Sequence, residues 1–170
     1  MTDVYGTLEQ CITYHVARGR SAWGASGEDE ALEAALLRGS EAIDRKYGSR
    51  FLGVKTGGRE QDREWPRSRP SGGEISDRYG FEIGVNEVPK EVINAAYEAA
   101  ELERVNPGSI NPVITPNRQV QSERVEGAVS RTFFERADTR AAIPVITFID
   151  ELLESLMRVR TMNITHVNRA

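Results

Sequence analysis

The amino-acid sequence predicts a mainly α protein: a small helical bundle with a short β-hairpin, long loops and an extended C-terminal tail. Three observations lead to this fold class. Apolar residues recur at the spacing of a helix face in four segments, one segment alternates like a pair of short strands, and glycine is concentrated between the second and third helices. With 170 residues, the chain is long enough for one domain with a core of its own. We expect this domain to cover residues 1–158 and the tail to cover residues 159–170.

The first two helices are expected over residues 7–18 and 28–47. Ser26 and Asp29 have the spacing of a capping box at the start of the second helix. Gly48 follows its last apolar residue, and glycine at this position commonly ends a helix.

The third helix is expected to begin at Pro89 and to stop at Asn106, where a proline and a glycine follow. Its apolar face is rich in alanine, which allows a neighbouring helix to approach closely. The fourth helix is expected over residues 144–158, with isoleucine and leucine on one face.

The remaining segments lack a helical pattern. Residues 48–88 contain eight glycines and two prolines, which predicts a long loop, and a loop of this length usually has a function. Residues 119–134 alternate on both sides of Glu126 and Gly127, which predicts a hairpin. Residues 160–170 carry two arginines and no acidic residue, and we expect an extended tail.

Composition and charge exclude several classes of protein. The formal net charge is −4, so any contact with nucleic acid must come from a local patch. No apolar stretch approaches the roughly 20 residues that a membrane-spanning helix needs, and we expect no membrane association. The first residues are acidic and polar, from which we expect no signal peptide.

The sequence contains no pattern typical of an enzyme. His15 and His166 are far apart, and no histidine–cysteine pair has metal-ligand spacing, so we expect no metal site. Cys11 is the single cysteine and fits a small buried residue of the first helix. Phosphate-binding and hydrolase motifs are missing. We therefore expect a protein that is not an enzyme and that has no cofactor.

Aromatic residues among arginines allow two interpretations. The aromatic residues are Trp23, Phe51, Trp65 and Tyr79, and six arginines lie near them in the sequence. Such a set can stack on bases and contact phosphates, or the aromatic rings can anchor loops to the core while the arginines pair with neighbouring acids. The negative net charge favours the second interpretation.

Several segments, taken together and in order, resemble the head–tail connector (adaptor) proteins of tailed bacteriophages, a family often labelled DnaT-like. The matching segments are residues 14–19 followed by Trp23, residues 35–40 and 47–53, Gln61 with residues 65–67, residues 88–92, Ala95 with Ala96, residues 98–101 and residues 123–130. The resemblance spans the chain from Tyr14 to about Ser130.

The resemblance implies a structural virion protein in the neck of the particle, present in the host cytoplasm during assembly. Such proteins form a ring, typically a dodecamer, between the capsid portal and the stopper or tail, and extend the channel through which double-stranded DNA passes. The expected partners are therefore the portal protein, the stopper or tail-completion protein, and further copies of the chain.

Two sets of site residues accompany this expectation. The tail alternates like an exposed strand that could add to the sheet edge of another protein, although a frayed terminus fits equally well. On the first interpretation the portal-binding residues are Arg160, Thr161, Met162, Ile164, Val167 and Arg169. The loop around Trp65 is expected at a subunit interface through Phe51, Trp65 and Arg67.

The alternative to the connector is a single-stranded DNA-binding module of DnaT-like type. It predicts an affinity that falls with salt, because phosphate binding releases counterions. The net charge of −4 and the scarcity of lysine count against it.

Overall fold

The computed structural model describes residues 4–25, 27–111, 122–125, 129–132 and 146–158, and this part of the chain is mainly helical. The α-helices are α1 (Leu8–Val16), α2 (Asp29–Tyr47), α3 (Lys90–Val105) and α4 (Thr147–Leu153). Single 3-10 turns are η1 (Ser21–Gly24), η2 (Gly48–Arg50), η3 (Gly58–Glu60) and η5 (Glu154–Leu156). Among the described helices, none combines the length and the apolar character needed to cross a membrane.

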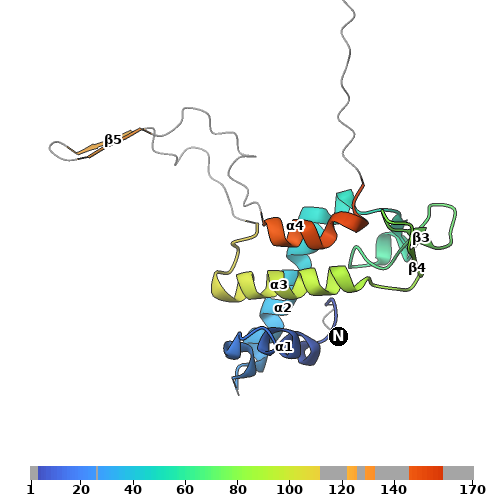
Figure 1. Cartoon of the computed structure of the whole chain (residues 1–170), viewed down its shortest axis with the longest axis horizontal. Coiled ribbons are helices and arrows are strands. Elements are labelled where there is room, and N and C mark those ends of the chain that lie inside the picture. Colours follow the sequence, from blue (N-terminus) through green and yellow to red (C-terminus); the bar gives the residue numbers. More distant parts are fainter. Residues whose placement is uncertain (1–3, 26, 112–121, 126–128, 133–145, 159–170) are drawn as a thin grey trace, which may run out of the picture.

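Helices α2 and α3 form the centre of the fold. In Figure 1, α3 lies between α1 and α4, and α2 runs across it. The two backbones approach closely at Gly39, where an added Cβ would lie 2.5 Å from the backbone nitrogen of Ala100 and 2.8 Å from the carbonyl oxygen of Ala96. The alanine-rich face of the third helix thus has the closely packed neighbour that its composition predicts.

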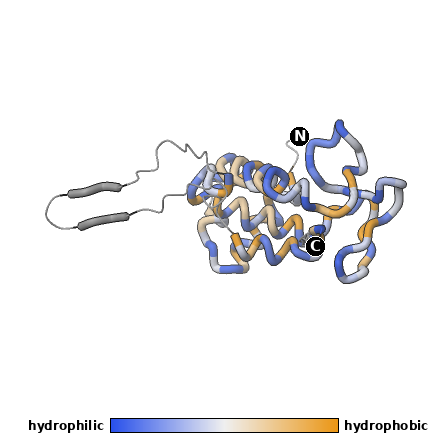
Figure 2. Tube along the Cα trace, turned by 90° about the horizontal axis from the view of Figure 1, so that it is seen from above, coloured by the Kyte–Doolittle hydropathy of each residue, from blue (hydrophilic) through white to orange (hydrophobic). Residues whose placement is uncertain are grey.

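Two hydrophobic clusters lie along this pair of helices. One joins α1 and η1 to the N-terminal half of α2, with Trp23 and Leu36 buried within it. The larger cluster joins the C-terminal half of α2 to α4 and to the loops, and contains Phe51, Trp65 and Ile149. Figure 2 shows that the loops between α2 and α3 are mostly hydrophilic, with short hydrophobic stretches that supply these contacts.

The predicted helices are confirmed, with shorter ends. Thr7 caps α1 by accepting a hydrogen bond from the backbone N–H of Gln10 at 3.2 Å. The capping box expected for α2 is not the observed cap, because the helix begins after Glu28, whose side chain makes no capping bond, and Ser26 lies outside the described residues. α3 begins at Lys90, one residue later than expected, and Pro89 is its N-cap, with a ψ of 143° that is not helical.

The segment expected as one long loop contains short antiparallel strands. β1 (Val54–Lys55) pairs with β2 (Arg67–Ser68), and β3 (Ile75–Ser76) pairs with β4 (Glu82–Ile83). The hairpin expected within residues 119–134 is confirmed as β5 (Ser122–Val125) and β6 (Val129–Thr132), with Val125 opposite Val129. Residues 159–170 lie outside the described part of the chain, and their separation as a tail stays a prediction.

Candidate nucleic-acid interface

The β3–β4 hairpin presents a turn that is fixed by its own hydrogen bonds. Ile75 and Ile83 face each other across the strands, and both are buried in the larger cluster. In the turn, the Asp77 carboxylate accepts hydrogen bonds from the backbone N–H groups of Tyr79 and Phe81, both at 2.8 Å. Gly80 takes the left-handed conformation, φ +90°, which costs glycine little. The turn therefore holds Tyr79 and Phe81 on a defined backbone.

Both aromatic rings of this turn face solvent. Tyr79 is 70% exposed and Phe81 is 71% exposed, more than any other large hydrophobic side chain of the described residues. Apolar rings left in water on a rigid support favour a binding surface, because covering them with a partner recovers hydrophobic free energy without ordering the backbone. We define Tyr79 and Phe81 as the aromatic turn.

The aromatic turn is attached to the C-terminal end of the described chain. The backbone N–H of Arg78 donates to the carbonyl of Ser155 at 2.8 Å, and the Arg78 guanidinium forms an ion pair with Glu154. Three residues beyond Ser155, the backbone N–H of Arg158 donates to the carbonyl of Arg50 at 2.8 Å. The hairpin, η5 and Arg158 are therefore neighbours. In Figure 1, β3 and β4 lie near the C-terminal end of α4.

The charge around the aromatic turn is mixed. The hairpin itself carries the exposed carboxylates of Glu74 and Glu82, with Asp77 engaged in the turn. Arg158 is exposed and its guanidinium donates to the Gly53 carbonyl at 3.3 Å, with no carboxylate at ion-pair distance within the described residues. The hairpin therefore presents exposed rings beside carboxylates, and Arg158 adds an exposed cation on one side of it.

The structure separates the aromatic residues that the sequence grouped with arginines. Trp23, Phe51 and Trp65 are core residues, and only Tyr79 reaches the surface. Phe81 was not identified from the sequence. Isoleucines flanking an Asp-Arg-Tyr-Gly-Phe segment are the signal that could have found it, because aspartate and glycine favour a turn and place the aromatic residues at its tip.

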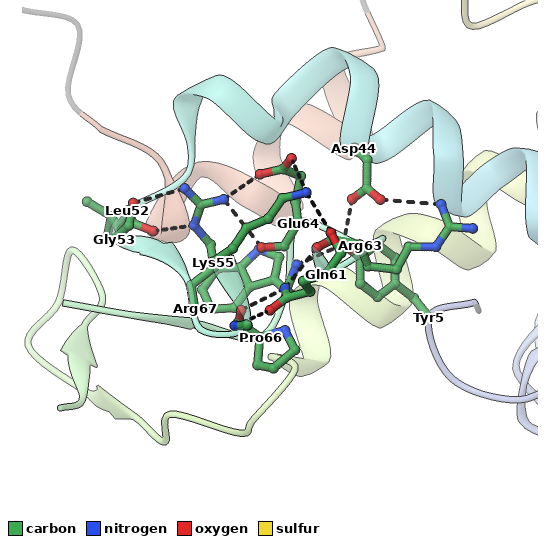
Figure 3. A network of polar contacts seen from close by, with 12 residues as sticks. Tyr5, Asp44, Leu52, Gly53, Lys55, Gln61, Arg63, Glu64, Pro66 and Arg67 are labelled. Carbon is green, nitrogen blue, oxygen red and sulfur yellow. Dashed lines mark hydrogen bonds and ion pairs between the residues drawn. The ribbon is translucent and has the colours of Figure 1, made fainter. Parts of the chain in front are cut away.

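Phe51, Trp65 and Arg67 make contacts within the chain. Phe51 and Trp65 pack edge to face, 5.6 Å between ring centres. The Arg67 guanidinium donates to the carbonyls of Leu52 and Gly53 at 2.7 and 2.9 Å and pairs with Glu64 at 2.6 Å (Figure 3). All three side chains are buried, and their role at a subunit interface stays a prediction.

A second part of this network holds the loop to α2. Asp44 accepts from the Tyr5 hydroxyl at 2.5 Å and pairs with Arg63 at 3.3 Å, and the Tyr5 oxygen accepts from the backbone N–H of Trp65 at 3.1 Å (Figure 3). Burial raises the pKa of Asp44 and, together with the adjacent carboxylate, that of Tyr5. The network positions the loop. At Gly53 the loop passes close to the hairpin, because an added Cβ there would lie 3.1 Å from the side chain of Ile75.

His15 is an internal structural residue that joins α1 to α3. Its Nε2 lies 3.0 Å from the carbonyl of Tyr97, which can only accept, so Nε2 carries the proton and Nδ1 accepts from Arg20 at 2.9 Å. The ring stacks on Trp23 with centres 4.3 Å apart. The neighbouring carboxylates are Glu98, paired with Arg20 at 2.8 Å, and Glu101, which accepts from the Trp23 indole at 2.7 Å.

Burial lowers the pKa of His15, with Arg20 adding to the effect, which predicts a loss of stability in mild acid. The unfolded chain takes up this proton first as the pH falls below about 6.5, the ordinary histidine value. The contribution is therefore complete above that pH and decreases below it, by at most about 1.4 kcal/mol per pH unit. Urea unfolding followed by circular dichroism from about pH 8 to about pH 5 measures the slope.

The chain offers a matched pair of controls for this prediction, because His15 and His166 are its two histidines. His15→Gln keeps a donor for Tyr97 and an acceptor for Arg20 but does not titrate, so it should flatten the slope near pH 6. His166→Gln should leave the slope unchanged. Equal slopes in wild type and His15→Gln would contradict the assignment.

Cys11 is a buried apolar residue, as the sequence predicts. Burial and the nearby Glu101 and Glu98 raise the pKa of its thiol to about 12, so it is protonated at neutral pH. Within residues 4–25, 27–111 and 146–158, no three histidine, cysteine, aspartate or glutamate side chains are grouped as metal ligands would be. The six residues predicted to bind a portal protein, which begin at Arg160, lie outside the described part of the chain.

Comparison with known proteins corrects the predicted function. No curated protein and no solved structure matches the chain. A family model described as DnaT-like ssDNA binding protein matches residues 2–170. This match shows that the connector identification is wrong. The portal, stopper and ring partners and the virion role that accompanied it are wrong as well. The DnaT-like part of the resemblance is confirmed. The chain belongs to the family of DnaT-like single-stranded-DNA-binding proteins.

Proposed function

We propose that this protein binds single-stranded DNA and that bases stack on the aromatic turn. The exposure of both rings of this hydrogen-bonded turn carries the proposal. Every base has an aromatic face, so stacking is tolerant of sequence and contributes about 1–3 kcal/mol for each base. The family description, which names the same ligand, supports it.

Stacking on an exposed turn favours single strands over duplexes. In a duplex, each base face is already covered by its neighbours, and a protein ring reaches it only after unstacking, which costs a few kcal/mol. In a single strand the faces of the bases are accessible. Tyr79 and Phe81 are two residues apart, a spacing suited to two neighbouring bases of one strand.

Arginines near the hairpin would supply contacts to phosphate. Arg158 lies beside Arg50 and Gly53, and from Ser155 onward the chain has three arginines and no acidic residue. The charge of this end of the chain is therefore positive, whereas the net charge of the whole protein is −4. With few cations involved, stacking contributes more of the affinity than charge does.

On this proposal, the protein acts by binding and transforms no substrate. The family description names a binding activity and no reaction, which supports this part of the proposal. Two buried residues with altered pKa values, His15 and Asp44, contact structural partners: His15 contacts Tyr97 and Arg20, and Asp44 pairs with Arg63. These contacts hold the helices and the loop in place.

Fluorescence anisotropy with an end-labelled oligonucleotide tests the proposal. We expect the full chain to bind the single strand at least tenfold more tightly than the same sequence as a duplex. Each phosphate contact in a single strand contributes about −0.7 to the slope of log K against log salt, so three arginines give a slope no steeper than about −2. Equal or tighter binding of the duplex would contradict the proposal, as would no binding of the single strand.

A further inference from the structure

We propose that the groove between residues 4–8 and α2 docks a partner protein through a basic amphipathic helix of that partner. The groove lies on the N-terminal half of α2 and has a volume of about 380 Å³. The aromatic turn is attached beyond the other end of α2, whose first and last residues lie about 27 Å apart at a rise of about 1.5 Å per residue. Figure 1 shows β3 and β4 well away from α1. The proposal therefore concerns a second surface and does not depend on DNA binding.

The floor of the groove is apolar and open to solvent. Five apolar side chains form it: Val4, Leu8, Ala34, Leu36 and Leu37. Leu36 is buried, and the others are half-buried. Ala34 and Leu37 belong to neither hydrophobic cluster of the fold. Covering these side chains with a partner recovers hydrophobic free energy that the core of the protein leaves unused.

The rim of the groove is acidic. Glu30 and Glu33 line it, and both are exposed with no ion pair or hydrogen bond among the residues that the structure describes. The two segments that form the groove, residues 4–10 and 28–37, contain five acidic residues and no lysine or arginine. This local charge attracts a cationic partner and repels nucleic acid and anionic membranes.

The spacing of the side chains along α2 fits a helix as the occupant. Two acidic and two apolar residues recur at i, i+3, i+4 and i+7 and form one face about 10 Å long: Glu30, Glu33, Ala34 and Leu37. Gly39, where α3 approaches, lies two residues beyond Leu37 and thus on nearly the opposite side of α2. This face is therefore left for a partner helix of about two turns, with apolar residues at the same spacing and lysine or arginine beside them.

Fluorescence anisotropy of the full chain with a labelled model peptide tests the proposal. The peptide has about 14 residues, with leucines at the spacing of a helix face and lysines at the other positions. We expect Glu30→Gln/Glu33→Gln to weaken its binding at least fivefold, because the rim loses the charges that face the lysines. Leu37→Ser should weaken binding by a similar factor, because it removes apolar floor, and circular dichroism checks that the helices remain.

The matched control is Glu60→Gln/Glu91→Gln, which removes the same charge from exposed carboxylates outside the groove and should leave the affinity unchanged. Tyr79→Ala/Phe81→Ala should also bind the peptide like wild type, because the aromatic turn is not part of the groove. The same peptide with glutamate in place of lysine should bind at least tenfold more weakly than the lysine peptide.

Equal affinities of wild type and both groove variants would overturn the proposal. An equal loss in the Glu60→Gln/Glu91→Gln control would also overturn it, because that result assigns the attraction to net charge. So would failure of the lysine peptide to bind the wild-type chain. Since no DNA is present, these outcomes are independent of the test of single-stranded DNA binding.

Discussion

Replacing Tyr79 and Phe81 together by alanine should weaken binding to single-stranded DNA by at least about 30-fold. Two lost stacking contacts at about 1–3 kcal/mol each amount to at least about 2 kcal/mol, and about 1.4 kcal/mol corresponds to a tenfold change in affinity. The rings are about 70% exposed, so their removal should leave the fold intact. Anisotropy at one fixed salt concentration measures the effect, and circular dichroism checks the fold.

Two controls distinguish stacking from a general loss of apolar surface. Phe148 on α4 is a third exposed aromatic residue, 50% exposed and outside the hairpin, and Phe148→Ala should leave the affinity unchanged. The double variant Tyr79→Phe/Phe81→Tyr keeps two aromatic faces and should bind like wild type. If the double alanine variant kept its affinity, the aromatic turn would have to be abandoned as the DNA site.

Replacing Trp65 by alanine should remove about 3–5 kcal/mol from the free energy of unfolding. The ring is 2% exposed, contacts Phe51 edge to face and lies in the larger hydrophobic cluster that joins α2, α4 and the loops. Since domains of this size are stable by about 5–15 kcal/mol, the loss is a large part of the total. Urea unfolding followed by far-UV circular dichroism measures it.

Trp65→Phe is the matched control. It keeps an aromatic ring against Phe51 and removes a buried indole N–H that has no hydrogen-bond partner among the residues the structure describes. We therefore expect a smaller loss than for alanine. A Trp65→Ala protein with unchanged unfolding at every protein concentration would show that Trp65 does not stabilise the fold of the single chain.

The hairpin shows why the candidate site was only partly predictable. Tyr79 was noticed because an aromatic residue lay among arginines, yet the same reasoning selected Trp23, Phe51 and Trp65, which are buried. Local sequence could not separate the two cases, because burial depends on which segments meet in three dimensions. Ile75 and Ile83 turn a glycine-rich loop into a hairpin by reaching the core, and that contact leaves the ring of Tyr79 outside.

The function shows a different limit. Net charge of −4 counted against a nucleic-acid ligand, but this quantity averages the acidic N-terminal half of α2 with a C-terminal end that carries only positive charge. Electrostatic binding depends on the local arrangement of charges, and stacking does not depend on net charge at all. The family match, by its description, reverses the order of the two hypotheses.

The sequence by itself determined the local features of the fold. The helical periodicities of α1 to α4, the end of α3 at Asn106 and the β5–β6 hairpin all follow from interactions between residues close in the chain. The tertiary structure decided which side chains are buried and which are exposed. Gly39 against Ala100, Arg67 on the Leu52 carbonyl and Arg78 on Ser155 join segments that no periodicity relates, and these long-range contacts place the aromatic turn at the surface.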